Sequence, residues 1–154
     1  DLKSVNVRLM VFLTAAFSVG GTLKACGVAE ILFSRFASVF PASFSPKYVA
    51  VALAVTMSLH MILGSNLTTM SVVVPGLMTV GAGVAQPIPL MFLICLAVCG
   101  HFLLPFHSLF MILGEGNGFF STRQLVRYGV PNTALVFFGG LLIYAGYWTL
   151  AGLL

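Results

Sequence analysis

Long apolar runs alternate with short polar interruptions along this chain, and the pattern predicts helices of membrane-crossing length. The first run covers residues 5–23 and the last covers residues 125–154. A helix needs about 20 consecutive apolar residues to cross the hydrocarbon core of a bilayer. The first run has about that length, and the last run is longer. We therefore expect a transmembrane helix over 5–23 and another over 125–154.

The segment 24–40 differs because charged residues interrupt its apolar background. Lys24, Glu30 and Arg35 fall between apolar residues that recur at roughly helical spacing. This pattern is typical of an amphipathic helix that lies in the plane of the membrane interface. After it, Ser45 and Pro46 are typical of the cap and the first turn of the next helix.

A polar tip separates two uncharged apolar arms within residues 46–85. The tip covers residues 64–69, and its members after the glycine are Ser65, Asn66, Leu67, Thr68 and Thr69. Because an unpaired polar group in hydrocarbon costs several kcal/mol, the tip indicates a bound ligand, a water-filled cavity or a tight helical hairpin. Each arm is about 24 Å long as a helix, against roughly 30 Å of hydrocarbon. We expect a re-entrant hairpin, while two short spans with the tip at a membrane surface remain the alternative.

A second interruption divides the apolar stretch 90–118. The run that starts at Leu90 stops at Pro105-Phe106-His107-Ser108, and a shorter run follows before a glycine-rich turn. Neither run alone is long enough to cross a bilayer comfortably, but together they have about the length of one span. We therefore predict a single transmembrane helix over 90–118 that is broken near its middle.

The composition places the chain among membrane proteins. Sixty per cent of its residues are hydrophobic and 6% are charged, with a mean hydropathy of +1.11, whereas soluble proteins have about 25% charged residues. We expect an all-α, multi-pass integral membrane protein of the plasma or inner membrane, with residues 1–154 as one module in the lipid bilayer. The net charge of +4 is scattered, so no nucleic-acid partner is expected.

The three histidines are His60, His101 and His107. His107 lies where the helix should break, and two roles stay open for it. It either donates to an anion or relays a proton, or it only bonds a backbone carbonyl in a kinked helix. His60 and His101 are interpreted as structural or interfacial. Since His101 and His107 are six residues apart, a spacing that fits neither i+3 nor i+4 on a helix, no histidine metal site is expected.

With its hairpin tip and its broken helix, the sequence resembles the C-terminal half of the divalent anion/sodium symporter family, whose members carry dicarboxylates, citrate or sulfate. The family has a Ser-Asn-Thr signature at the hairpin tip, which Ser65-Asn66-Leu67 matches with an apolar third residue. Leu104-Pro105 resembles the family's Leu-Pro step, residues 114–118 its glycine-rich turn, and Gly129-Val130-Pro131-Asn132 its closing segment. Many members have Ala-Thr-Pro-Pro-Asn after the Leu-Pro step, where this chain has residues 106–110.

The resemblance implies one inverted-repeat half of a secondary transporter, with an N-terminal half of the same transporter as its partner and a homodimer as its assembly. It implies coupled transport of a small anion with Na⁺ or H⁺ by alternating access. The implied ion and substrate site consists of Ser65, Asn66, Leu67, Thr68, Thr69, Pro105, Phe106, His107 and Ser108. Na⁺ would lie at Ser65, Asn66 and the backbone near Phe106 and His107, and no other cofactor is implied.

Two other classes of function stay open. A non-transporting membrane subunit would use the polar tip only to pack helices, where small polar residues are common. An intramembrane enzyme would need a nucleophile with a base in reach, such as Ser65 or Ser108 with His107. No nucleophile motif surrounds Ser65, so we expect no enzyme.

Overall fold

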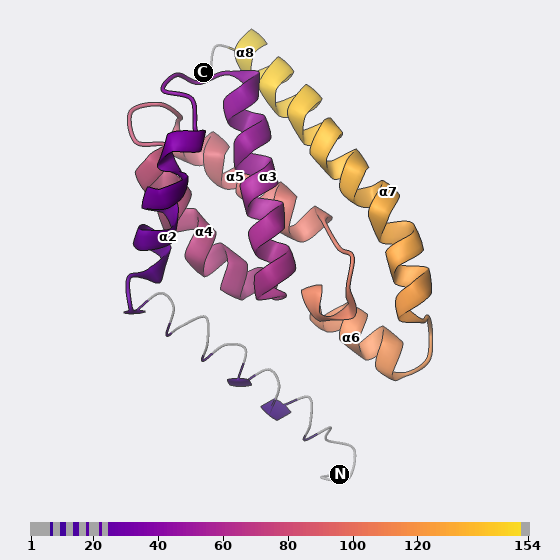
Figure 1. Cartoon of the computed structure of the whole chain (residues 1–154). Helices are drawn as coiled ribbons and strands as arrows, with labels where there is room; N and C mark the ends of the chain where they lie inside the picture. The colour runs from indigo at the N-terminus through magenta and orange to yellow at the C-terminus, as the bar shows by residue number, and fades with distance from the viewer. Residues whose placement is uncertain are drawn as a thin grey trace.

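The computed structural model describes residues 25–151 and, before them, positions 7, 10, 11, 14, 15, 18 and 22. Every regular element in this part of the chain is helical, so the predicted all-α class is confirmed there (Figure 1). Most of the predicted helix over 5–23 lies outside the described residues, as do the last three residues of the predicted helix over 125–154.

Two helices joined by a tight turn form the two arms on either side of the polar tip (Figure 1). α3 (Pro46–Leu63) begins after Ser45, whose side chain accepts a hydrogen bond from the backbone N–H of Tyr48, and Pro46 lies in its first turn. The predicted cap is therefore confirmed. α4 (Asn66–Val80) starts after only two intervening residues.

A third helix, α5 (Pro87–Gly100), packs against both α3 and α4. Close packing of apolar side chains stabilises such a group of helices in water or in lipid, because a void would forfeit dispersion contacts. The side chains at its centre are each 2% exposed or less: Tyr48, Val49, Ala52, Leu53, Val72, Val73, Leu77, Leu93, Ile94, Ala97 and Val98.

α2 (Val28–Phe36) covers α4 and is followed by a short 3₁₀ turn, Ala37–Val39. The Phe33 ring is buried and lies over Gly76 of α4, where a Cβ atom would collide with the ring. The absence of a side chain at Gly76 is therefore what lets the two helices approach.

A break lies between α5 and α6 (Leu109–Gly116), within the stretch where the sequence predicts one. After α5 ends at Gly100, the backbone is extended at Leu104 and then forms one 3₁₀ turn, η3 (Pro105–His107). Proline has no N–H and biases the residue before it toward extended conformations, which keeps the helix from continuing.

The last helix runs along one side of the bundle (Figure 1). α7 (Thr122–Gly140) begins with a capping box of Ser121 and Gln124, and it continues through a π-helical segment, Leu141–Ala145, into α8 (Gly146–Leu150). Its start lies three residues before the predicted boundary at 125. By length and apolar composition, this continuous helix and α3 are the two described helices that could cross a membrane.

Candidate functional site at the hairpin tip and the helix break

The hairpin tip is a two-residue connection. Gly64 has φ +65°, a left-handed conformation that glycine adopts without strain, and its N–H bonds the carbonyl of His60. Ser65 is the N-cap of α4, where its Oγ accepts a hydrogen bond from the N–H of Thr68. One residue thus ends α3 and the next one starts α4.

The tip faces the break between α5 and α6. The Phe106 ring lies so close to Gly64 that a Cβ atom on that glycine would come within 2.5 Å of Phe106 Cδ2. The rings of His60, one turn before the tip, and His107, next to Phe106, have centroids 4.7 Å apart. The two interrupted segments, which are far apart in the sequence, therefore meet in the fold.

The residues that the sequence predicts for the site lie in three environments. Thr68, Thr69 and His107 are buried, Ser65, Asn66, Pro105 and Ser108 are half-buried, and Leu67 and Phe106 are exposed. The hydroxyl of Ser65 caps α4, and that of Ser108 caps α6 by accepting the N–H of Phe110. Both serines therefore lie at helix N-termini, where free backbone N–H groups and the helix dipole favour negative charge.

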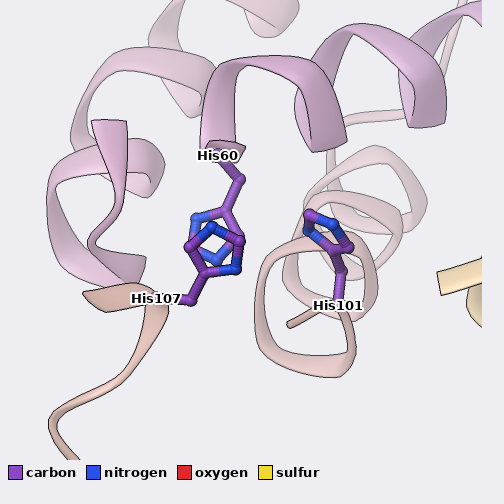
Figure 2. A group of neighbouring side chains, drawn as sticks. All are labelled: His60, His101 and His107. Atoms are coloured by element: carbon purple, nitrogen blue, oxygen red, sulfur yellow. The ribbon is translucent and has the colours of Figure 1, made fainter. Parts of the chain in front are cut away.

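All three histidines of the chain converge at this place (Figure 2). Each is at most 2% exposed. The ring centroids lie 4.7 to 5.5 Å apart, and one nitrogen from each ring lies within 4.8 Å of the other two. The spacing argument against a histidine metal site treated His101 and His107 as members of one helix, and the structure does not bear out that premise. The backbone between them is not α-helical, so helical spacing does not apply.

Neighbouring groups hold two of the three rings. His60 Nδ1 and Thr69 Oγ1 are 2.9 Å apart, and this hydrogen bond joins the two arms of the hairpin. The backbone N–H of Leu103 donates to His107 Nδ1 over 3.0 Å, which ties the backbone of the break to the imidazole. Each of these rings therefore has one nitrogen engaged, and its other nitrogen is left for the cluster.

α7 supports the break through its residues Gly129 and Asn132. A Cβ atom on Gly129 would overlap the carbonyl oxygen of Phe102, so only glycine permits this close approach. Asn132 Nδ2 donates to the carbonyl of Gly100 over 2.6 Å, which is one of the carbonyls left without a helical partner at the end of α5. These contacts fix the backbone on both sides of His101.

Unpaired nitrogen atoms are the distinctive chemical feature of the cluster. In the described part of the chain, four buried side-chain polar atoms have no hydrogen-bond partner: His60 Nε2, His101 Nδ1, His107 Nε2 and the Tyr48 hydroxyl. Three of the four belong to this cluster. A buried polar group without a partner costs about 1–3 kcal/mol, so the cluster is destabilising unless something binds to it.

The sequence connects His107 with the site but misses His60 and His101. His60 precedes the tip by one helical turn, while His101 and His107 bracket the break. Their shared position beside the two polar interruptions is the signal that was available. Both are buried inside the fold, which fits the structural one of the two roles expected for them.

In comparisons with family models, with curated proteins and with solved structures, nothing matches this chain. What the site does is therefore inferred from its geometry, together with the sequence features described above.

Proposed function

We propose that the chain is one module of a secondary carrier that moves a small anion across a membrane, coupled to Na⁺ or H⁺. The observation that carries the proposal is the contact between hairpin tip and break, at Gly64 with Phe106 and at His60 with His107. Carriers bind substrates and ions where interrupted helices meet, because the backbone there offers polar groups that a continuous helix uses internally. The dicarboxylate, citrate or sulfate class of substrate follows from the family resemblance.

The outer surface of the last helix supports a location in a membrane. Apolar side chains on α7 and the segments that follow it are 59% to 90% exposed, namely Leu135, Phe138, Leu142, Ile143 and Leu150. Soluble monomers rarely expose contiguous apolar patches of large size. Lipid, or the N-terminal half of the same transporter, would cover this face.

Two helix N-termini supply the anion-binding groups in this proposal. α4 starts at Asn66 behind the Ser65 cap, and α6 starts at Leu109 behind the Ser108 cap. Free N–H groups and the positive end of the helix dipole would hold a carboxylate or sulfate without a lysine or arginine. Hydroxyl and carbonyl oxygens at the same interruptions are the ligands a Na⁺ ion takes, and His107 offers a route for H⁺.

Alternating access would require the site between the tip and the break to face one side of the membrane and then the other. In the proposed mechanism the hairpin moves against a scaffold. The N-terminal half of the transporter and a second copy in a homodimer would provide that scaffold.

Uptake by the full-length protein in proteoliposomes tests the proposal. Labelled succinate, citrate and sulfate are offered under a Na⁺ gradient and under a pH gradient, and the protein should accumulate at least one of them. Asn66→Ala should slow uptake about tenfold or more, because a hydrogen bond to a charged group contributes about 1.5–3 kcal/mol. Asn117→Ala is the matched control, because Asn117 lies at the C-terminal end of α6 and bonds the Leu113 carbonyl.

Two outcomes would contradict this proposal. If the folded protein takes up none of the anions under either gradient, a non-transporting membrane subunit is favoured. If Asn66→Ala transports as fast as the wild type, the tip does not belong to the substrate site. The enzyme alternative gains no support, because the hydroxyls of Ser65 and Ser108 cap helices and neither bonds a histidine in the described part of the chain.

A further inference from the structure

Three imidazoles, each with one unpaired nitrogen, meet at one buried place. Figure 2 shows the rings gathered between the end of α3 and the break, each entering from a different segment. The chain has 154 residues and three histidines, and all three are here. A buried group of polar atoms that is left unsatisfied in the fold indicates a bound species that completes it.

The chemistry of the donor atoms selects the kind of ligand. Imidazole nitrogen suits Zn²⁺ and its neighbours among the transition metals, whereas Na⁺, Mg²⁺ and Ca²⁺ take oxygen ligands. Zn²⁺ binds histidine nitrogen at about 2.0–2.1 Å. Three nitrogens within 4.8 Å of one another reach a common metal at that distance when each shifts by less than about 1 Å.

We propose that His60, His101 and His107 together bind one divalent transition-metal ion, with Zn²⁺ as the expected ion. The site joins the end of α3, the end of α5 and the turn η3, so the metal would clamp the hairpin tip to the break. This proposal does not depend on anion transport.

The surroundings of His60 suit a metal ligand. When the proton lies on Nδ1 and is donated to Thr69 Oγ1, the lone pair of Nε2 is available to a metal. Metal-binding histidines usually donate their second ring N–H to a neighbouring oxygen, which fixes the tautomer and the orientation of the ring. Thr69 is thus a positioning residue for His60.

His107 must give up one hydrogen bond to bind the metal. Its Nδ1 accepts the Leu103 N–H, so in the neutral ring the proton lies on Nε2. The metal either takes the place of the Leu103 N–H at Nδ1, or the ring makes a half-turn that frees Nε2. Losing one such hydrogen bond lowers the association constant of the metal about fivefold. Structural zinc sites in small proteins have association constants of about 10⁷ M⁻¹ or more, so a loss of about fivefold is small. Metal binding therefore prevails, and it loosens the turn between Leu103 and His107.

Three protein ligands leave the fourth position of a tetrahedral zinc ion open. Water or an anion would fill it. Since all three imidazoles are neutral ligands, the ion would favour a negatively charged fourth ligand. The identification of that fourth ligand with the transported anion rests on the proposed function, but the metal site itself does not.

Metal binding to the purified full-length protein tests the proposal. The protein is stripped with a chelator and titrated with Zn²⁺, and with Co²⁺ to record the absorption bands of a tetrahedral nitrogen site. Cys26, Cys95 and Cys99 are replaced by Ser throughout to remove competing thiols. We expect one Zn²⁺ per chain, a thermal unfolding midpoint that rises with added Zn²⁺, and no rise with Mg²⁺.

Each of H60Q, H101Q and H107Q should weaken Zn²⁺ binding at least about 100-fold, since even the loss of a supporting residue weakens a metal site 10–100-fold. Tyr48→Phe is the matched control, because the Tyr48 hydroxyl is also buried and unpaired but lies outside the cluster. Its Zn²⁺ affinity should equal that of the wild type.

A folded wild-type protein that binds no Zn²⁺ would overturn the site. So would a variant with all three substitutions, H60Q/H101Q/H107Q, that binds Zn²⁺ as tightly as the wild type. If a histidine variant fails to fold, Zn²⁺-edge X-ray absorption of the wild type decides the question, because it must show nitrogen ligands at histidine distances. Zinc binding without uptake would contradict only the carrier function. Uptake without zinc binding would contradict only the metal site.

Discussion

The two ends of the α3–α4–α5 group differ in what fills them. Toward the start of α3 the interior is apolar apart from the Tyr48 hydroxyl, with Val49 and Leu53 beside Tyr48 on α3. At the tip end the same helices bury polar side chains. The buried polar side chains of the described residues are Thr56, His60, Thr68, Thr69, His101 and His107. Thr56 lies about two turns before the tip on α3, and the other five lie on the tip, on the turn before it or at the break.

This difference indicates a division of roles along the same helices. The apolar end contributes packing that needs no partner, whereas the histidine end contains nitrogens that are unsatisfied until something binds. Natural proteins often accept such a local loss of stability where a ligand binds. Substitutions at the apolar end should therefore change stability alone, and substitutions at the tip end should change binding as well.

The largest loss of stability is expected from Leu77→Ala in α4. Leu77 is fully buried in the apolar end, and truncation of a buried leucine costs about 2–5 kcal/mol through the cavity that it leaves. Chemical denaturation in detergent measures the change, and Zn²⁺ affinity per folded molecule should stay the same. Ile62→Ala is the control, since Ile62 is 78% exposed and should change the free energy of unfolding by no more than about 0.5 kcal/mol. Equal losses for both would show that the apolar end is not the main stabilising region.

Gly64→Ala should lower the free energy of unfolding by less than Leu77→Ala does, but it should also disturb the contact between the tip and the break. A side chain at Gly64 meets left-handed backbone strain and also the Phe106 ring. Gly83→Ala separates these effects, because Gly83 has φ +76° and open space around its Cβ position. Gly64→Ala should therefore lower the free energy of unfolding by about 1–3 kcal/mol more than Gly83→Ala does.

The double variant G64A/F106A identifies the source of that excess. Removing the Phe106 ring should recover most of it, since the overlap with the ring then disappears and only the backbone strain remains. No recovery would mean that the contact between tip and break is not what Gly64 protects.

The parts of this fold that local chemistry specifies could be predicted from the sequence. Ser45 with Pro46 marks the start of α3 because a hydroxyl cap and a proline act within one turn. Gly64 and Ser65 mark the tip because a glycine ends one helix in the left-handed conformation and a serine hydroxyl caps the next. Pro105 marks the break because its ring excludes a continuous helix. Each of these signals depends on a few neighbouring residues.

The histidine cluster could not be predicted in the same way, because it depends on how separate segments pack. His60 meets the other two only after the hairpin docks on the break, and the break is placed in turn by Gly129 and Asn132 of α7. Spacing rules describe ligands on one continuous element. Here the non-helical backbone between His101 and His107 removes the basis of the rule.

The smallest change in stability is expected from Thr69→Val, and it gives the sharpest comparison of the two ends. Valine keeps the shape of the side chain but leaves His60 Nδ1 without its partner, which should cost about 1–2 kcal/mol. If Thr69 positions a metal ligand, Zn²⁺ affinity should also fall about 10–100-fold. Thr79→Val is the control on the same helix, because the Thr79 hydroxyl bonds only the Pro75 carbonyl. A Thr69→Val protein that loses stability but keeps full Zn²⁺ affinity would make the bond to His60 purely structural, and the tip end would then resemble the apolar end.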